Sequence, residues 1–188
     1  SSVSEAPFGQ NAGTGFLNNI RIRNNYMTGG YFGIILQGMN TTQKSTNLLI
    51  DSNIIENSYF YGIYNYCGEA KIEANIIRSR VAFTNNSFYG IRSYYAEGTI
   101  IGNKIWQRSN TIISSCGISL YYHNHGDSTN DLIANNEISV FTTQNFYGLY
   151  VGYSSADIVH NSIHVTSTGS GNGIYVLSHS SNQLTIQN

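Results

Sequence analysis

Two glutamates at equivalent points of the sequence are the first candidates for chemistry. Glu69 and Glu97 each lie seven residues after a glycine and three residues before an isoleucine, so they are predicted to lie side by side. Paired carboxylates can act as the acid and the nucleophile of a glycosidase, at about 5–5.5 Å for retention and about 6.5–9.5 Å for inversion. The alternative is a pair of solvated turn residues whose charges are screened by salt.

A second candidate is a polar segment in which two histidines and an aspartate lie close together. His123 and His125 are two residues apart, so both rings would lie on one face of a strand, with Asp127 nearby. Imidazole and carboxylate groups are zinc ligands, and this spacing permits a metal site. The alternative is a long polar loop, in which such residues need no metal to explain them. The chain holds no other recognisable cofactor motif, and we expect no cofactor.

Tyrosine supplies the third and largest set of candidates. The chain holds 15 Tyr, and several follow a Gly-Ile or Gly-Leu pair at a fixed distance. Since side chains alternate along a strand, the residues two and four positions after each glycine are expected to point outward together. The outward residues that we predict to bind a ligand are Tyr64, Tyr66, Arg92, Tyr94, Tyr121 and Tyr150, with Tyr175 beyond them.

Two interpretations of this outward set remain open. Aromatic rings stack on the flat faces of sugars, and the phenol hydroxyl adds a hydrogen bond, so the set is compatible with glycan binding. In that case Tyr64, Tyr94 and Tyr121 are expected to line a shallow groove. The alternative is that tyrosine suits an exposed strand, where neighbouring rings stabilise the sheet or a packing interface.

An internal repeat identifies the elements that must position these residues. The pattern Ile-x-x-Asn-x-(Ile/Met) occurs six times, with successive asparagines 22 to 33 residues apart. It alternates strictly with six copies of Gly-(Ile/Leu). The repeated asparagines are Asn25, Asn53, Asn75, Asn103, Asn136 and Asn161.

A repeat of this length indicates short strands that stack coil upon coil, because one repeat cannot bury a hydrophobic face alone. It predicts an all-β fold, a right-handed parallel β-helix of about seven coils with 22–33 residues in each. Residues 1–16 would form a lead-in or cap, and residues 17–188 the helix. Each repeated asparagine is expected at a corner, at or near the left-handed backbone region that asparagine tolerates.

Composition limits the possible partners. The net charge is −1, and no basic stripe or polybasic patch is present, so we expect neither nucleic acid nor a membrane surface as a partner. No apolar run is long enough for a membrane span. The first seven residues lack signal-peptide features, and Ser1 in place of Met leads us to expect a processed product or an excised piece. Cys67 and Cys116 are predicted to be two coils, or about 9.6 Å, apart, which is too far for a disulfide.

The two alternating rows resemble those of parallel β-helix proteins of the pectate-lyase-like superfamily, from Leu17 to the end of the chain. The strings Asp157–Ile163 and Gly173–Val176 are similar to repeat regions of very large secreted bacterial surface proteins. This resemblance implies a fold, but it does not imply one activity, because the superfamily includes lyases, hydrolases, epimerases, phage tailspikes and non-catalytic surface proteins.

The function that we expect is that of a non-catalytic structural or adhesive segment of a secreted or cell-surface protein, which forms filaments or binds glycan through its Tyr-rich face. The alternative is part of a polysaccharide-active enzyme, a lyase or a glycoside hydrolase. A lyase needs a base and positive charge at the uronate, and Arg92 alone supplies little of either. The expected partners are a polysaccharide and, at the ends, either another copy or further coils of a longer parent chain.

Overall fold

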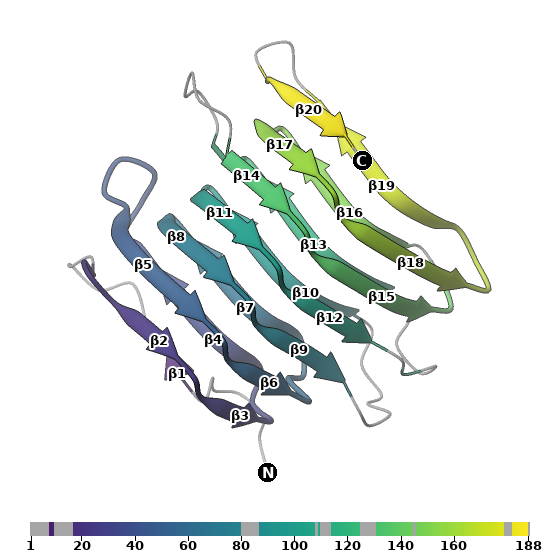
Figure 1. The fold of residues 1–188 in the computed structure, drawn as a ribbon, viewed down its shortest axis with the longest axis horizontal. Coiled ribbons are helices and arrows are strands. Elements are labelled where there is room, and N and C mark those ends of the chain that lie inside the picture. Colours follow the sequence, from purple (N-terminus) through teal and green to yellow (C-terminus); the bar gives the residue numbers. More distant parts are fainter. Residues whose placement is uncertain are drawn as a thin grey trace.

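The computed structural model is a parallel β-solenoid, whose stacked coils form three parallel β-sheets (Figure 1). It describes residues 8–9, 17–79, 87–107, 109, 114–124, 131–144, 146–178 and 182–187. These residues contain strands and no helix, so the all-β fold predicted from the repeat is confirmed. Strands β1–β3 lie at one end of the stack, and β19 and β20 lie at the other (Figure 1).

Each sheet collects at most one strand from each coil, and all strand pairs are parallel. Sheet 1 consists of β1 (Phe8–Gly9), β4 (Phe32–Gln37), β7 (Tyr61–Tyr66), β10 (Ser87–Tyr94), β13 (Ser114–Tyr121), β16 (Phe146–Gly152) and β19 (Gly171–Leu177). Sheet 2 consists of β2 (Arg21–Arg23), β5 (Ser45–Asp51), β8 (Gly68–Glu73), β11 (Glu97–Ile101), β14 (Asp131–Ala134), β17 (Ala156–Val159) and β20 (Leu184–Gln187). Sheet 3 consists of β3 (Tyr26–Thr28), β6 (Ile54–Glu56), β9 (Ile76–Ser79), β12 (Lys104–Gln107), β15 (Glu137–Thr142) and β18 (Ser162–Ser167).

The number of complete coils is lower than the predicted seven. In the described part of the chain, β4 to β18 form five coils with a full strand in every sheet. The coil before them starts with the two-residue strand β1, and the coil after them contributes only β19 and β20. The sequence rows continue into these partial coils, which is why counting rows overestimates the complete turns.

Stacked isoleucines fill the interior, as the repeat predicts. Ile22, Ile50 and Ile72 are direct neighbours in sheet 2, and the row continues in register to Ile158. Its six members are at most 5% exposed. Full burial of a side chain of this size contributes about 1.5–3 kcal/mol, so these rows supply most of the hydrophobic stabilisation of the fold.

The repeated asparagines form a continuous ladder at the corner between sheets 2 and 3. In each step, the backbone N–H and the Nδ2 group of one asparagine donate to Oδ1 of the next, as from Asn53 to Asn75 at 3.0 and 2.9 Å. Nδ2 also donates to the carbonyl of an isoleucine one coil earlier, as from Asn75 to Ile50. The predicted column of asparagines is therefore confirmed.

The backbone conformation predicted for these asparagines is wrong. The left-handed position at this corner belongs to the residue immediately before each one, with φ between 52° and 65° at Asn24, Ser52, Ala74, Gly102, Asn135 and His160. The left-handed residue turns the chain, and the next residue then points inward, where its amide joins the ladder. The asparagine is thus required for its side-chain hydrogen bonds and not for its backbone freedom.

The glycine row of sheet 1 is explained by close packing across the interior. A Cβ atom at Gly62 would lie 2.4 Å from Cγ2 of Ile77 in sheet 3 and 2.5 Å from the carbonyl oxygen of Gly90. The glycine and the following isoleucine are both buried, so the strict alternation of sheet 1 is interrupted at this point. As a result, the residue before the glycine points outward, which the period-2 pattern alone does not show.

The structure describes part of the N-terminal segment. Phe8 of β1 is the register partner of Ile34, so part of the predicted cap joins sheet 1. Residues 1–7 and 10–16 lie outside the described residues. Cys67 and Cys116 form no disulfide, as the coil spacing predicts, and both are buried.

Candidate functional site

The outer face of sheet 1 carries an array of aromatic rings arranged in columns that run along the solenoid axis. The first column holds Phe32, Tyr61, Tyr89, Cys116 and Tyr147. The second column holds Ile35, Tyr64, Arg92, Ser119, Tyr150 and Tyr175. The third column holds Gln37, Tyr66, Tyr94, Tyr121, Gly152 and Leu177. We refer to these columns together as the aromatic array.

The structure brings the outward residues predicted from the sequence together on this face. Arg92 is the register partner of Tyr64 on one side and of Ser119 on the other, and Tyr150 follows Ser119. The first column was missed, because its residues precede the glycine and the alternation is interrupted there. The recurring aromatic-Gly-Ile order is the sequence signal from which it could have been found.

A fourth column was also missed, at the corner where sheet 1 ends. Tyr95, Tyr122 and Tyr153 each have a left-handed backbone, with φ of 50°, 51° and 49°. Their rings stack at 4.8 and 5.1 Å, with interplanar angles of 3° and 14°. A bulky residue rarely adopts this backbone conformation, so the stack at this corner offsets a conformational cost.

Neighbouring rings of the array are one strand spacing apart. Tyr61 and Tyr89 have centroids 5.3 Å apart, and Tyr94 and Tyr121 are 5.5 Å apart. Such pairs contribute about 0.5–1.5 kcal/mol beyond the burial of their area. Part of the array is therefore explained by stabilisation of the sheet alone.

Arg92 is the cation within the array. Its guanidinium carbon lies 5.9, 5.1 and 5.5 Å from the ring centres of Tyr61, Tyr89 and Tyr94. Nη1 donates to the Tyr61 hydroxyl at 3.3 Å, whereas Nε is buried and has no hydrogen-bond partner among the described atoms. No described carboxylate forms an ion pair with Arg92. In the part of the chain that the structure describes, the guanidinium is therefore contacted by ring faces and one tyrosine hydroxyl and by no carboxylate.

Two hydroxyls of the array, those of Tyr64 and Tyr150, remain protonated at neutral pH. Burial raises the pKa of Tyr64 to about 12, although the charge of Arg92 acts in the opposite direction. Burial also raises the pKa of Tyr150 to about 12, with the neighbouring Tyr121 adding to the shift. These phenols can therefore donate hydrogen bonds to a ligand over the whole physiological range.

A cavity of about 350 Å³ opens within the array. Arg92, Tyr121 and Tyr150 of the predicted set line it, whereas Tyr64 and Tyr94 are not among its lining residues. The other walls are Tyr89 and Tyr147 of the first column, and the remaining lining residues are Cys116, Ser119, Ser87, Ser114 and Ser115. Of the three residues expected to line a groove, Tyr121 lines this cavity, and the groove along Tyr64 and Tyr94 stays a prediction.

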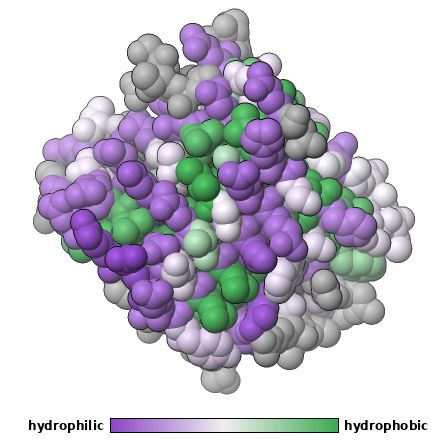
Figure 2. All heavy atoms as spheres, in the orientation of Figure 1, coloured by the Kyte–Doolittle hydropathy of each residue, from purple (hydrophilic) through white to green (hydrophobic). Residues whose placement is uncertain are grey.

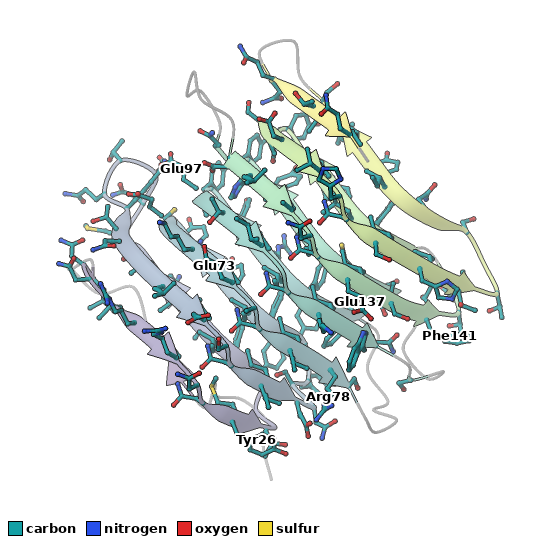
Figure 3. The ribbon with its side chains drawn as sticks, viewed as in Figure 1. Tyr26, Glu73, Arg78, Glu97, Glu137 and Phe141 are labelled. Carbon is teal, nitrogen blue, oxygen red and sulfur yellow. The ribbon has the colours of Figure 1, made fainter. Side chains whose placement is uncertain are left out.

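The two candidate glutamates occupy the predicted places. Glu69 and Glu97 are direct register partners in sheet 2. Glu97 forms an ion pair with Lys44, which belongs to the segment between β4 and β5, and Figure 3 shows Glu97 beside that segment. This ion pair gives Glu97 a structural role, and the catalytic role stays a hypothesis.

The first candidate histidine lies inside the solenoid, where its ring joins two polar side chains. Nδ1 of His123 lies 2.8 Å from Oγ of Ser93, and Nε2 lies 3.0 Å from Oδ2 of Asp131. The same aspartate oxygen accepts the backbone N–H of Gly98 at 2.6 Å. Serine, histidine and aspartate in this order form catalytic triads, but Ser93 is 1% exposed and no substrate could reach it.

The predicted metal site is not assembled by the described residues. They contain no group of three or more histidine, cysteine, aspartate or glutamate side chains that could hold a metal ion. His125 and Asp127 lie outside the described residues, so their part in the hypothesis is not addressed. His123 alone is placed, as a buried residue that connects coils.

The other two sheets have a different surface. Figure 2 shows hydrophilic residues over much of the side formed by sheets 2 and 3, with hydrophobic residues in smaller groups. Charges on these sheets are paired across coils, as in Arg23–Asp51 at 2.9 Å and Lys104–Glu137 at 3.6 Å, the latter at the position labelled in Figure 3. Within the described residues, no helix has the length and apolarity that a membrane span requires.

No family model, curated protein or solved structure matches this chain. The likeness stated from the repeat therefore stands at the level of the parallel β-solenoid fold.

Proposed function

We propose that this chain is a non-catalytic, glycan-binding solenoid whose aromatic array contacts a polysaccharide. The observation that carries the proposal is the concentration of tyrosine rings and hydroxyls on one outer sheet, around a cavity. Rings of this kind stack on sugar faces while their hydroxyls bond to sugar hydroxyls. The role is that of an adhesive or structural segment of a secreted or cell-surface protein, similar to the bacterial surface proteins whose repeats the sequence resembles.

The enzymatic alternative receives no comparable support. Glu97 is engaged by Lys44, and Ser93 is enclosed together with His123. The array around the cavity offers hydroxyl groups, rings and one guanidinium, which are suited to binding and do not include a general base at neutral pH.

Replacing Tyr64 and Tyr94 together by alanine is expected to reduce retention on an insoluble polysaccharide at least about fivefold. Two stacking contacts of about 0.5–1.5 kcal/mol each correspond to that loss. Retention is measured by sedimentation with the polysaccharide, and circular dichroism checks that the variant is folded.

The control for this experiment is Tyr26→Ala on sheet 3, where the ring is 64% exposed and lies outside the array. It should be retained like the unchanged protein. The array is a purely structural feature if the Tyr64/Tyr94 variant is retained as strongly as the control. The same conclusion follows if the unchanged protein is not retained on any polysaccharide.

We also propose that the coil end at β18–β20 associates with a second copy of the chain. Strand β19 is exposed along most of its length, with Ile174, Tyr175 and Val176 at 37–38%, and Ile186 of β20 is 47% exposed. Within the described residues these strands are paired on one side only. An open strand edge with apolar side chains is a template for another strand.

Self-association through this end is expected to depend on concentration and on Val176. Sedimentation velocity should show species larger than the monomer as concentration rises, and Val176→Lys should shift the population back to monomer, since a charge opposes burial. The control substitution Thr166→Lys, at an outward residue of β18, should have less effect on self-association. A single monomeric species at every concentration would rule out this contact.

A further inference from the structure

The cavity exists because one strand interrupts two columns of the aromatic array at the same level. Strand β13 places Cys116 in the first column and Ser119 in the second. The strands on either side place larger groups in these columns, namely Tyr89 and Arg92 on β10 and Tyr147 and Tyr150 on β16. A single strand with two small side chains therefore leaves a hollow between two aromatic walls.

The dimensions of this hollow fit one small ring. The flanking strands β10 and β16 are two strand spacings apart, or about 9.6 Å. The strand between them, β13, has no aromatic ring at this level of the two columns. The volume of about 350 Å³ lies at the low end of the range for small-molecule sites. A single sugar ring can lie between the walls, in the place that a tyrosine would occupy in a continuous column.

The chemistry of the lining adds one charge and several hydroxyl groups. Among the described lining residues, Arg92 is the only Lys, Arg, His, Asp or Glu, and burial raises the pKa of both Tyr150 and Cys116 to about 12. Its buried Nε lacks a described hydrogen-bond partner. Most of the other lining residues carry a hydroxyl group, as Ser119 and Tyr150 do. This combination suits a ligand that has many hydroxyls and one negative charge.

We propose that the cavity binds one acidic sugar unit, whose anionic group is received by Arg92 while the ring lies between Tyr89 and Tyr147. The proposal rests on the glycan-binding function and narrows it to glycans that carry a carboxylate or a sulfate. Charge-assisted hydrogen bonds from a guanidinium are about twice as strong as neutral ones, so the anionic group sets the preference.

The test compares sugars that share a ring and differ in charge. Isothermal titration calorimetry of the purified chain is carried out with D-glucuronate, D-glucose 6-sulfate and D-glucose. Binding of at least one anionic sugar should be about tenfold stronger than that of glucose, as expected for a hydrogen bond to a charged group. The two anionic probes distinguish a carboxylate from a sulfate ligand. The preference should also decrease at high salt.

Two substitutions in the cavity should remove this preference by different routes. Arg92→Gln removes the charge and leaves the hollow, so glucuronate and glucose should bind equally. Ser119→Tyr fills the hollow with a residue that the same column accepts at Tyr150, so all monosaccharide binding should be lost while the fold is kept. Arg23→Gln, on sheet 2, is the matched control because it removes the same charge outside the array.

The outcomes separate this inference from the proposed function. Equal affinity for charged and neutral sugars, or binding that neither cavity substitution changes, overturns the acidic-sugar site. Retention on neutral polysaccharide without any charge preference overturns the site and leaves the glycan-binding function in place. Loss of every glycan interaction in the unchanged protein overturns both.

Discussion

Replacing Asn75 by alanine is expected to lower the free energy of unfolding by about 3 kcal/mol. The side chain is fully buried, and its Nδ2 group donates to the carbonyl of Ile50 at 2.9 Å and to Oδ1 of Asn103 at 3.0 Å. Its Oδ1 accepts two hydrogen bonds from Asn53. Truncation leaves the buried N–H of Asn53 without its acceptor, and each orphaned group of this kind costs about 1–3 kcal/mol.

Urea unfolding followed by circular dichroism measures this loss, and amide exchange at Asn53 locates it. The matched control is Asn25→Ala, because Asn25 belongs to the same ladder but is exposed at its first rung. Water can replace its hydrogen bonds, so the loss there should be below about 1 kcal/mol. Equal effects at Asn25 and Asn75 would show that burial of the ladder contributes nothing.

This ladder illustrates which parts of the fold could be predicted from the sequence. The spacing of six asparagines identified the column, because identical residues at equivalent places must stack in a solenoid. The local backbone could not be predicted in the same way. The left-handed position is filled by residues as different as Ala74 and His160, so no residue type marks it. Asparagine tolerates that conformation, which made it the wrong candidate.

The candidate site was predicted in part for a similar reason. Alternation after the glycine correctly placed Tyr64, Arg92 and Tyr150 on one face, since each side chain there obeys a period of two. It missed Tyr89 and Tyr147, because the buried Gly-Ile pair shifts the phase of the strand. The cavity itself is created by small residues between large ones, so it appears only when neighbouring coils are compared.

Contacts across the interior were beyond the reach of the pattern. The hydrogen bond of His123 with Ser93 and its contact with Asp131 join residues 30 and 8 positions away in sequence, on strands of different sheets. Their geometry depends on how a corner loop closes over the coil, and the repeat carries no information about that loop. A polar segment that resembled a metal site in the sequence therefore contributes, in its described part, to the packing of the coils.

Replacing Gly90 by alanine is expected to destabilise the solenoid by about 3 kcal/mol. An added Cβ atom would lie 2.5 Å from Cγ2 of Ile105 and 2.6 Å from the carbonyl oxygen of Gly117. The first contact is a clash with a side chain of sheet 3 across the interior. The second is a clash with the backbone of the adjacent strand, which cannot move without breaking hydrogen bonds between the strands of sheet 1. Thermal and urea unfolding of the variant measure the loss.

The same column provides the control, because Gly173 precedes Ile174 in an equivalent strand, and a Cβ atom added there would meet no atom within 4 Å. Gly173→Ala should therefore change stability by less than about 0.5 kcal/mol. A second test combines Ile105→Ala with Gly90→Ala in one double variant. Removing Cγ2 relieves one of the two close contacts, so the double variant should be more stable than the sum of the single losses predicts. Simple additivity, or an equal loss at Gly90 and Gly173, would mean that close packing between the sheets does not explain the glycine row.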